Sequence, residues 1–343
     1  MISSRREFLH KAAGSAAALS IAPEILSAAT TKTAGAQKPH ASPETILALF
    51  KALPGEYSVK IYAPAANGKP EYLVQSPNSS KMLFVGSAFK SFVLCQALSQ
   101  ADSADVMKKI TGEQLTLDAS VWSLDSAVFN PPNLIGKVSE RTALEAMIMH
   151  SDNTATDMCE KYVGADRVRE FVASIGLKNT MIPDSTRSFF GYLLGAKNYR
   201  MFTWDELCAA IDKPMVNPPL NQVETLASSA DDFVSYYSQA LAGKFFKNEQ
   251  TLRVFRQILS MGDAIWLVPL PLGVSAFVKG GSIDVTGHHA LCVPGGMLFD
   301  DRWVYFCLTL NWPAPAESDP ATVQAFAAAC STALTRVKEA LSC

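Results

Sequence analysis

The spacing of apolar residues predicts β-strands near both ends of the chain and helices between them. A helical stripe follows Ser42-Pro43, a pair suited to a helix N-cap and first turn. Residues 57–62 and 72–75 are short β-prone runs, and Asn67-Gly68 between them favours a hairpin. The N-terminal part therefore predicts one helix followed by two paired strands.

The rest of the chain changes from helical to strand-like spacing near residue 245. Residues 87–98 have the apolar spacing of a helix, and helices joined by loops are expected from 100 to about 245. Strands are predicted at 275–278, 290–293 and 304–310 with glycine-rich turns between them, and an amphipathic helix at 321–341. This order predicts one sheet built from both ends of the chain. Residues 37–98 and 246–343 then form a sheet-containing subdomain, and 99–245 a helical one.

The N-terminal segment reads as an export signal. Arg5-Arg6 and the charged residues around them precede a weakly apolar stretch, residues 12–29, which is the layout of a twin-arginine signal peptide. Cleavage is expected after Ala29 or Ala36, with the second favoured, so that residues 1–36 are removed and the mature protein is periplasmic. The alternative is a chance arginine pair on a disordered tail.

Composition narrows the partners but leaves the function open. The chain is 48% hydrophobic and 18% charged with a net charge of −2, so no broad basic field exists to attract nucleic acid or anionic lipid. Beyond the signal, no apolar run reaches the roughly 20 residues that span a bilayer. No metal or cofactor motif is present. We expect a monomeric protein without a membrane anchor that acts on a small molecule.

The cysteine count is odd, so at least one thiol stays unpaired. Most of the cysteines fall at apolar positions of predicted helices and strands, where a free cysteine behaves as a small buried hydrophobic residue. Buried free thiols are the favoured interpretation, and a structural disulfide is the alternative. The seven are Cys95, Cys159, Cys208, Cys292, Cys307, Cys330 and Cys343.

Three short segments in a fixed order supply the groups of a covalent acyl-transfer site. They are Ser87-Ala88-Phe89-Lys90, Ser151-Asp152-Asn153 and Lys279-Gly280-Gly281. A Ser-x-x-Lys spacing is common by chance, a Ser-Asp-Asn triplet is rarer, and the ordered set is rarer still. A serine hydroxyl needs a base within hydrogen-bond reach, and Ser87 and Lys90 share one face of the predicted helix. Lys90 can be that base if burial or a neighbouring cation such as Lys279 lowers its pKa.

This set of motifs resembles that of the penicillin-recognising serine hydrolases, and most closely that of class A β-lactamases. The resemblance covers residue 43 to the C-terminus and is weakest between 178 and 225. It implies an α/β (α+β) fold, in which an antiparallel sheet flanked by helices lies beside an all-helical subdomain with the active site in the cleft between them.

The resemblance also assigns roles to the motif residues. Ser87 is the nucleophile, Lys90 its base, and Ser151 the hydroxyl that relays a proton to the departing nitrogen. Asn153 and Lys279 contact substrate, Lys279 as a clamp on a substrate carboxylate. The oxyanion hole consists of the N–H groups of Ser87 and Ser282. Gly281, a strand glycine, is expected where a substrate approaches the backbone closely.

Two departures from the family pattern bear on the mechanism. Gly280 replaces the usual threonine or serine, which removes a hydroxyl contact to substrate; Ser282 is a candidate to compensate. The Glu-x-x-x-Asn motif that activates the deacylating water is absent from its expected place at 183–187. Asp184 is a candidate substitute within a long stretch, 178–224, whose length is usual for a functional loop. Without a substitute, deacylation should be slow.

Three functions are compatible with these residues. The first is a serine β-lactamase-like hydrolase that cleaves a β-lactam amide through an acyl-Ser87 intermediate. The second is a peptidoglycan D,D-peptidase or another serine amidase of the same fold, since fold alone does not fix substrate. The third is a non-hydrolysing protein that binds β-lactams or peptidoglycan and stays acylated, which the missing glutamate favours.

Overall fold

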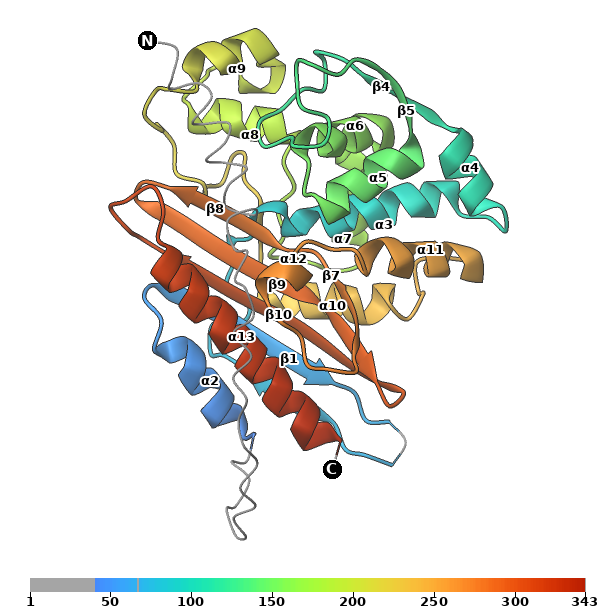
Figure 1. The fold of residues 1–343 in the computed structure, drawn as a ribbon, viewed down its shortest axis with the longest axis vertical. Coiled ribbons are helices and arrows are strands. Elements are labelled where there is room, and N and C mark those ends of the chain that lie inside the picture. Colours follow the sequence, from blue (N-terminus) through green and yellow to red (C-terminus); the bar gives the residue numbers. More distant parts are fainter. Residues whose placement is uncertain (1–40, 67, 343) are drawn as a thin grey trace, which may run out of the picture.

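A six-stranded antiparallel sheet is built from both ends of the chain, as the sequence pattern predicts (Figure 1). The computed structural model describes residues 41–66 and 68–342. The strand order is β2-β1-β10-β9-β7, and β8 also pairs with β9. The strands are β1 (Glu56–Ala63), β2 (Tyr72–Gln75), β7 (Ser275–Val278), β8 (Gly281–Val285), β9 (His288–Phe299) and β10 (Arg302–Trp312).

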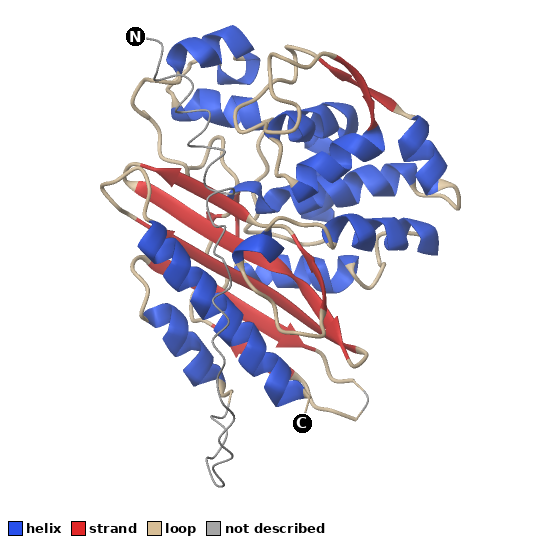
Figure 2. Ribbon diagram, viewed as in Figure 1, coloured by secondary structure: helices blue, strands red, loops and turns tan. Residues whose placement is uncertain are grey.

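Helices cover both faces of this sheet (Figure 2). Alternate residues of β10 point to opposite faces, so Phe306 and Leu308 join the core under α2 (Pro43–Lys51) and α13 (Pro320–Leu341). Cys307 joins the other core, together with residues of α10 (Ala230–Ala240). Because both faces are buried, β9 and β10 are almost continuously apolar.

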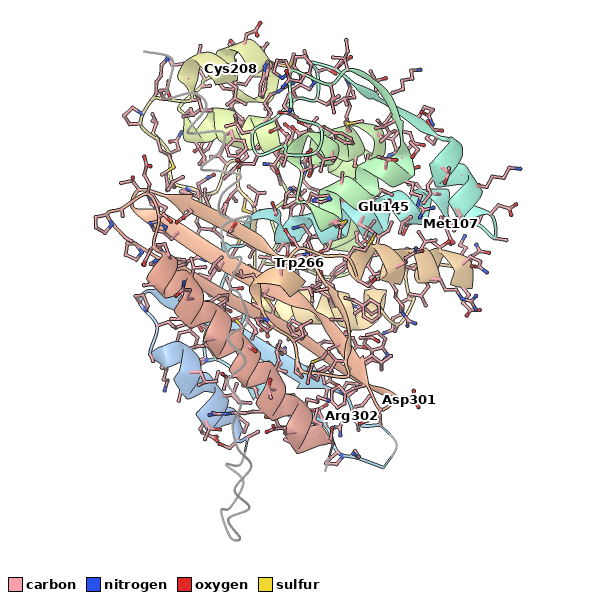
Figure 3. All side chains as sticks on the ribbon, viewed as in Figure 1. Met107, Glu145, Cys208, Trp266, Asp301 and Arg302 are labelled. Atoms are coloured by element: carbon pink, nitrogen blue, oxygen red, sulfur yellow. The ribbon has the colours of Figure 1, made fainter. Side chains whose placement is uncertain are left out.

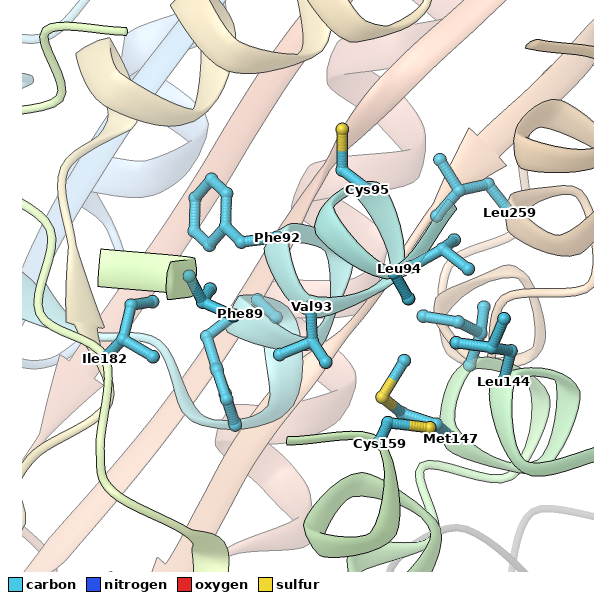
Figure 4. Close-up of a cluster of buried hydrophobic side chains, with 14 of the residues drawn as sticks. Phe89, Phe92, Val93, Leu94, Cys95, Leu144, Met147, Cys159, Ile182 and Leu259 are labelled. Atoms are coloured by element: carbon cyan, nitrogen blue, oxygen red, sulfur yellow. The ribbon is translucent and has the colours of Figure 1, made fainter. Parts of the chain in front are cut away.

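The helical part surrounds α3 (Lys90–Ala101), which follows a 3₁₀ turn, η1 (Gly86–Phe89). Figure 4 shows Phe89, Val93 and Leu94 packed among side chains of neighbouring helices, among them Leu144 and Leu259. The other helices are α4 (Val106–Gly112), α5 (Glu140–Met149), α6 (Asn153–Val163), α7 (Ala165–Ser174), α8 (Thr186–Leu193), η2 (Tyr199–Met201), α9 (Trp204–Ala210), α11 (Glu249–Leu259) and α12 (Ala264–Leu267).

Several elements differ from the pattern-based expectation. Residues 281–285, expected in a glycine-rich turn, form β8 against β9. Two small sheets lie outside the main one, β3 (Leu83–Phe84) with β6 (Ala227–Ser228) and β4 (Gln114–Leu117) with β5 (Gly136–Ser139). The stretch 178–224 contains α8, η2 and α9 and is not a long loop. Such short or polar segments carry too weak a periodicity to be predicted.

The boundary between the two proposed subdomains is not sharp. Helix α10 lies within the range 99–245, yet its residues pack on the sheet together with Tyr305 and Cys307 of β10. The same core continues through α3, α5 and α6. The division of the chain at residues 98 and 245 therefore remains a proposal about sequence ranges.

Some sequence-based expectations fall outside the described residues. These are the twin-arginine signal at 1–36, Asn67 of the predicted hairpin turn, and Cys343. In the described part of the chain, no helix has both the length and the apolar character needed to cross a bilayer. Within the same ranges, His, Cys, Asp and Glu side chains form no group of three that could hold a metal ion.

Five cysteines are buried free thiols, as favoured from the sequence: Cys95, Cys159, Cys292, Cys307 and Cys330. Cys292 of β9 and Cys307 of β10 lie closest, with 3.9 Å between their sulfur atoms. Burial raises the pKa of Cys95 to about 12 and also raises the pKa of Cys292. These side chains are therefore protonated and shielded at neutral pH.

Candidate active site

The first motif places Ser87 in η1, directly before α3. Ser87 is half-buried, whereas Lys90, the first residue of α3, is fully buried. A helix start presents unpaired backbone N–H groups, and these stabilise negative charge that develops nearby. The sequence thus places a serine hydroxyl at a position suited to nucleophilic attack.

The buried Lys90 ammonium joins the first motif to the second. Its Nζ donates to the backbone oxygen of Ser151 at 2.5 Å, to Asn153 Oδ1 at 2.6 Å and to Ser151 Oγ at 3.3 Å. Burial, and secondly the positive charge of Lys279, lower the pKa of Lys90 to about 7. An amine with this pKa is partly neutral at physiological pH and can accept a proton.

The Ser-Asp-Asn segment forms the turn between α5 and α6. Ser151 takes a left-handed backbone conformation, with φ of 55°, and Asn153 begins α6. Asp152 caps that helix by accepting from Ala155 N at 2.8 Å, and its other oxygen accepts from Val128 N at 2.9 Å. Asp152 therefore holds the turn by capping α6 and anchoring the segment before it.

The third motif places Lys279 on the side of Ser151 opposite to Lys90. Lys279 Nζ donates to Ser151 Oγ at 3.1 Å, so the Ser151 hydroxyl lies between two buried ammonium groups. The same Nζ donates to Gly280 O and to Asp263 Oδ2, each at 2.7 Å. Burial lowers the pKa of Lys279. Asp263 directly precedes α12 and was not singled out from the sequence.

Two glycines allow β8 to lie directly against η1. A β-carbon on Gly281 would lie 2.0 Å from Val85 O and 2.7 Å from Ser87 N. A β-carbon on Gly86, where φ is +52°, would lie 2.7 Å from Ser282 N. The N–H groups of Ser87 and Ser282, expected to form the oxyanion hole, therefore belong to two backbone segments in close contact. The Ser282 side chain is exposed.

The candidate for water activation, Asp184, is held by two arginines. Its Oδ1 accepts from Arg169 at 2.9 Å, and its Oδ2 lies 2.7 Å from Arg200 Nε. A nearby buried carboxyl, Asp157 on α6, accepts from Thr186 N and Thr186 Oγ1, both at 2.7 Å. Burial raises the pKa of Asp157 to about 6. Both carboxylates are therefore engaged in contacts of their own, Asp184 with two arginines and Asp157 with the backbone and hydroxyl of Thr186.

The structure thus brings together Lys90, Ser151, Asn153 and Lys279 by hydrogen bonds, and places the backbone of Gly281 and Ser282 against that of Ser87. Asp184 is engaged elsewhere. Reasoning from sequence missed Asp263, because its 16-residue separation from Lys279 has no local pattern. The sequence hinted at Asp263 only through Gly280, because a larger residue at that position would crowd the Asp263 carboxylate.

A serine at a helix start, a lysine of lowered pKa and a hydroxyl between two ammonium groups are groups that a serine hydrolase working by acyl transfer requires. The chain belongs to the Beta-lactamase enzyme family, whose family model matches residues 43–287. It is therefore a serine hydrolase of the β-lactamase type. No curated protein matches the sequence in a direct comparison.

Solved structures share this fold at low sequence identity. The TLA-3 extended-spectrum β-lactamase is 14% identical, with a TM-score of 0.66 over 87% of this chain and 98% of that one. A class A β-lactamase representative from Bacteroides cellulosilyticus is 18% identical, with a TM-score of 0.61 over 88% and 99% of the two chains. PBP-A is 16% identical, with a TM-score of 0.61 over 88% and 95%. At such identities the likeness shows the fold, which agrees with the α/β class expected from the sequence.

Proposed function

We propose that the protein opens a β-lactam or a related amide through an acyl-Ser87 intermediate and releases the acyl group slowly. The observation that supports this most is the hydrogen-bond network in which Lys90 and Lys279 both donate to Ser151 Oγ, together with the lowered pKa of Lys90. This network can move a proton between the nucleophile side and the leaving-group side of a scissile amide.

The acylation step follows from these groups. Neutral Lys90 takes the Ser87 hydroxyl proton while Ser87 Oγ forms a bond to the amide carbonyl carbon. The N–H groups of Ser87 and Ser282 stabilise the oxyanion of the tetrahedral intermediate. As the carbon–nitrogen bond breaks, Ser151 gives its hydroxyl proton to the departing nitrogen and is reprotonated from a neighbouring ammonium. Asn153 orients the amide side chain of the substrate.

Slow deacylation is proposed because the Glu-x-x-x-Asn motif is absent from its expected place and its two nearby candidate substitutes are engaged in other contacts. Both oxygens of Asp184 are occupied by Arg169 and Arg200, and Asp157 is buried and hydrogen-bonded. A general base contributes roughly 10²–10⁴-fold to such a step. One neighbour in fold, a mutant of PBP-A, has been solved as an acyl-enzyme complex with penicillin G. The missing glutamate also favours a second candidate function, that of a protein that is acylated and stays acylated.

The test is covalent labelling of the purified mature protein. A labelled penicillin should add its mass to a peptide containing Ser87, and Ser87→Ala should abolish the addition. The lifetime of the adduct, followed by mass spectrometry beside turnover of a chromogenic β-lactam, separates slow hydrolysis from permanent binding. Labelling of another serine, or no labelling by any acylating amide, would contradict the proposal.

Export completes the proposed function. Arg5-Arg6 and the apolar stretch that follows support a twin-arginine route to the periplasm. In that compartment the protein would act on a small β-lactam or on a peptidoglycan-like amide. We propose that it does so as a monomer.

A further inference from the structure

Asp263 forms an ion pair with the lysine that was expected to bind substrate. Its Oδ2 lies 2.7 Å from Lys279 Nζ, and its Oδ1 accepts from Gly280 N at 3.0 Å. The Lys279 side chain is fully buried, while Asp263 is 27% exposed. In Figure 3 the labelled Trp266, three residues further along on α12, marks this region beside the sheet. The charge of Lys279 is therefore balanced before any substrate arrives.

The hydrogen-bond donors of Lys279 are also fully used. An ammonium group has three N–H donors. In the structure they go to Ser151 Oγ, Asp263 Oδ2 and Gly280 O, at distances of 3.1, 2.7 and 2.7 Å. A substrate carboxylate could bind Lys279 only by displacing one of these oxygens, and it would then lie beside the negative charge of Asp263. Two carboxylates side by side in a partly buried site repel each other strongly, because little solvent screens their charges.

The glycine at position 280 is explained by the same aspartate. A β-carbon there would lie 3.2 Å from Asp263 Oδ1 and 3.1 Å from the β-carbon of Ala264, tighter than ordinary contacts. Threonine or serine, the residues usual in this family motif, would crowd the Asp263 side chain. Gly280 and Asp263 thus form one unit, in which the carboxylate takes the space of the missing side chain.

We propose that Asp263 is a specificity determinant that disfavours carboxylate-bearing substrates, which then acylate Ser87 more slowly, and favours amides that are uncharged at the position facing Lys279. This inference rests on the proposed acyl-transfer function of Ser87. In the protein, Lys279 then serves to lower the pKa of Lys90 and to hold Ser151, and it is not a clamp on a substrate anion. The substrate class becomes a lactam or peptide amide whose neighbouring acid is blocked as an amide or ester.

A matched pair of β-lactams tests the proposal. Benzylpenicillin carries a ring carboxylate, and its carboxamide derivative replaces that group with an uncharged one. The second-order rate constant for acylation of Ser87 is measured for each by mass spectrometry. The native protein should react with the carboxamide at least as fast as with the acid. Asp263→Asn keeps the shape and removes the charge, so the acid-to-amide ratio should rise by about 10- to 100-fold, the size of one charge-assisted hydrogen bond.

Two further variants complete the design. Asp231→Asn removes a carboxylate of α10 that forms a similar ion pair with Lys60 of β1, and should leave the ratio unchanged. Asp263→Ala with Gly280→Thr restores room and a hydroxyl at position 280, and should favour the acid more than Asp263→Asn does. A purely structural role for Asp263 would slow both compounds equally and leave their ratio unchanged.

The outcomes separate the two proposals. If native protein prefers the acid and Asp263→Asn leaves the ratio unchanged, the specificity inference is overturned while acyl transfer stands. If neither compound acylates Ser87 in any variant, the proposed function itself fails, and the inference falls with it. If the Asp263 variants do not fold, the ratio of the acylation rate constants of native protein for benzylpenicillin and its carboxamide decides whether the specificity inference holds.

Discussion

Lys90 is a buried lysine whose surroundings lower its pKa, which suits it to the proposed role of base. Its ammonium is desolvated and lies near a second buried ammonium, that of Lys279, and both effects favour the neutral amine. The hydrogen bonds to Asn153 Oδ1 and to two oxygens of Ser151 fix its position. Catalytic basicity here follows from burial and charge, and the sequence indicates it through the Ser-x-x-Lys spacing alone.

The pH dependence of acylation should report this amine. Because only neutral Lys90 accepts a proton, the acylation rate should rise as pH increases through about 7 and level off above it. Pre-steady-state acylation measured between pH 5 and 9 gives the profile. Lys279→Ala removes the like charge, so its profile should move to higher pH. A profile that is flat across neutral pH would assign the base to another group.

Asp184 should not contribute to deacylation. Arg169 and Arg200 hold both of its oxygens, so Asp184→Asn is expected to show the same burst and slow steady rate as the native protein. Stopped-flow kinetics with a chromogenic β-lactam measures both phases. A small burst in the native protein that becomes large in Asp184→Asn would instead identify Asp184 as the water-activating base.

Residues in contiguous motifs were predictable, and residues joined only by the fold were not. Ser87 and Lys90 follow from a short helical spacing, and Ser151, 61 residues from Lys90, follows from its place in the ordered set of motifs. Asp263 reaches Lys279 from a separate segment, and nothing in its own surroundings in the chain marks it. The substitution at Gly280 was visible in the sequence, but its cause, the space taken by Asp263, was not.

At the scale of elements, the contact between β8 and η1 decides the geometry of the site. Both segments supply backbone N–H groups, and both need glycine at the point of contact. Strand β8 was not predicted, because its polar–apolar alternation, Ser282 to Val285, is only four residues long and directly follows two glycines that favour a turn. The long strands β9 and β10 were predicted from their apolar runs, but the predicted ranges were shorter than the observed strands.

Substituting Gly281 tests this contact. In Gly281→Ala the new β-carbon would meet Val85 O and Ser87 N, so β8 must move away from η1. We expect acylation to fall by roughly 10²–10³-fold, the loss typical of one oxyanion-hole donor. Gly112→Ala is the control, because a β-carbon there meets nothing within 4 Å. Equal acylation rates in the two variants, measured on folded protein, would show that this close contact is not needed.

At the scale of the whole molecule, one core joins the sheet to the helices. Residues of α3, α5, α6 and α10 share a hydrophobic cluster with Cys292 of β9 and Cys307 of β10. The sheet assembled from both chain ends was predictable, because the longest apolar strand-like runs lie near those ends. The packing of α10 on the sheet was not, because an amphipathic helix does not specify the partner that it covers.

Export of the whole chain should depend on the arginine pair at its start. Changing Arg5-Arg6 to two lysines should trap precursor in the cytoplasm, because twin-arginine signals are read as addresses and not by charge alone. Fractionation and immunoblotting measure the periplasmic yield. A variant with Ser4 changed to alanine serves as the control. Unchanged periplasmic yield in the lysine variant would rule out this route.

The oxidation state of the five buried cysteines should depend on the compartment in which the chain folds. Disulfide formation needs an accessible thiolate, and burial raises the pKa of Cys95, Cys159, Cys292 and Cys330 while closing off solvent. If the chain folds in a reducing compartment, these cysteines are buried as thiols and stay reduced. A chain that arrives unfolded in an oxidising compartment exposes them all, with Cys292 and Cys307 neighbours in the final sheet. The redox state of these cysteines would therefore show in which kind of compartment the chain folded.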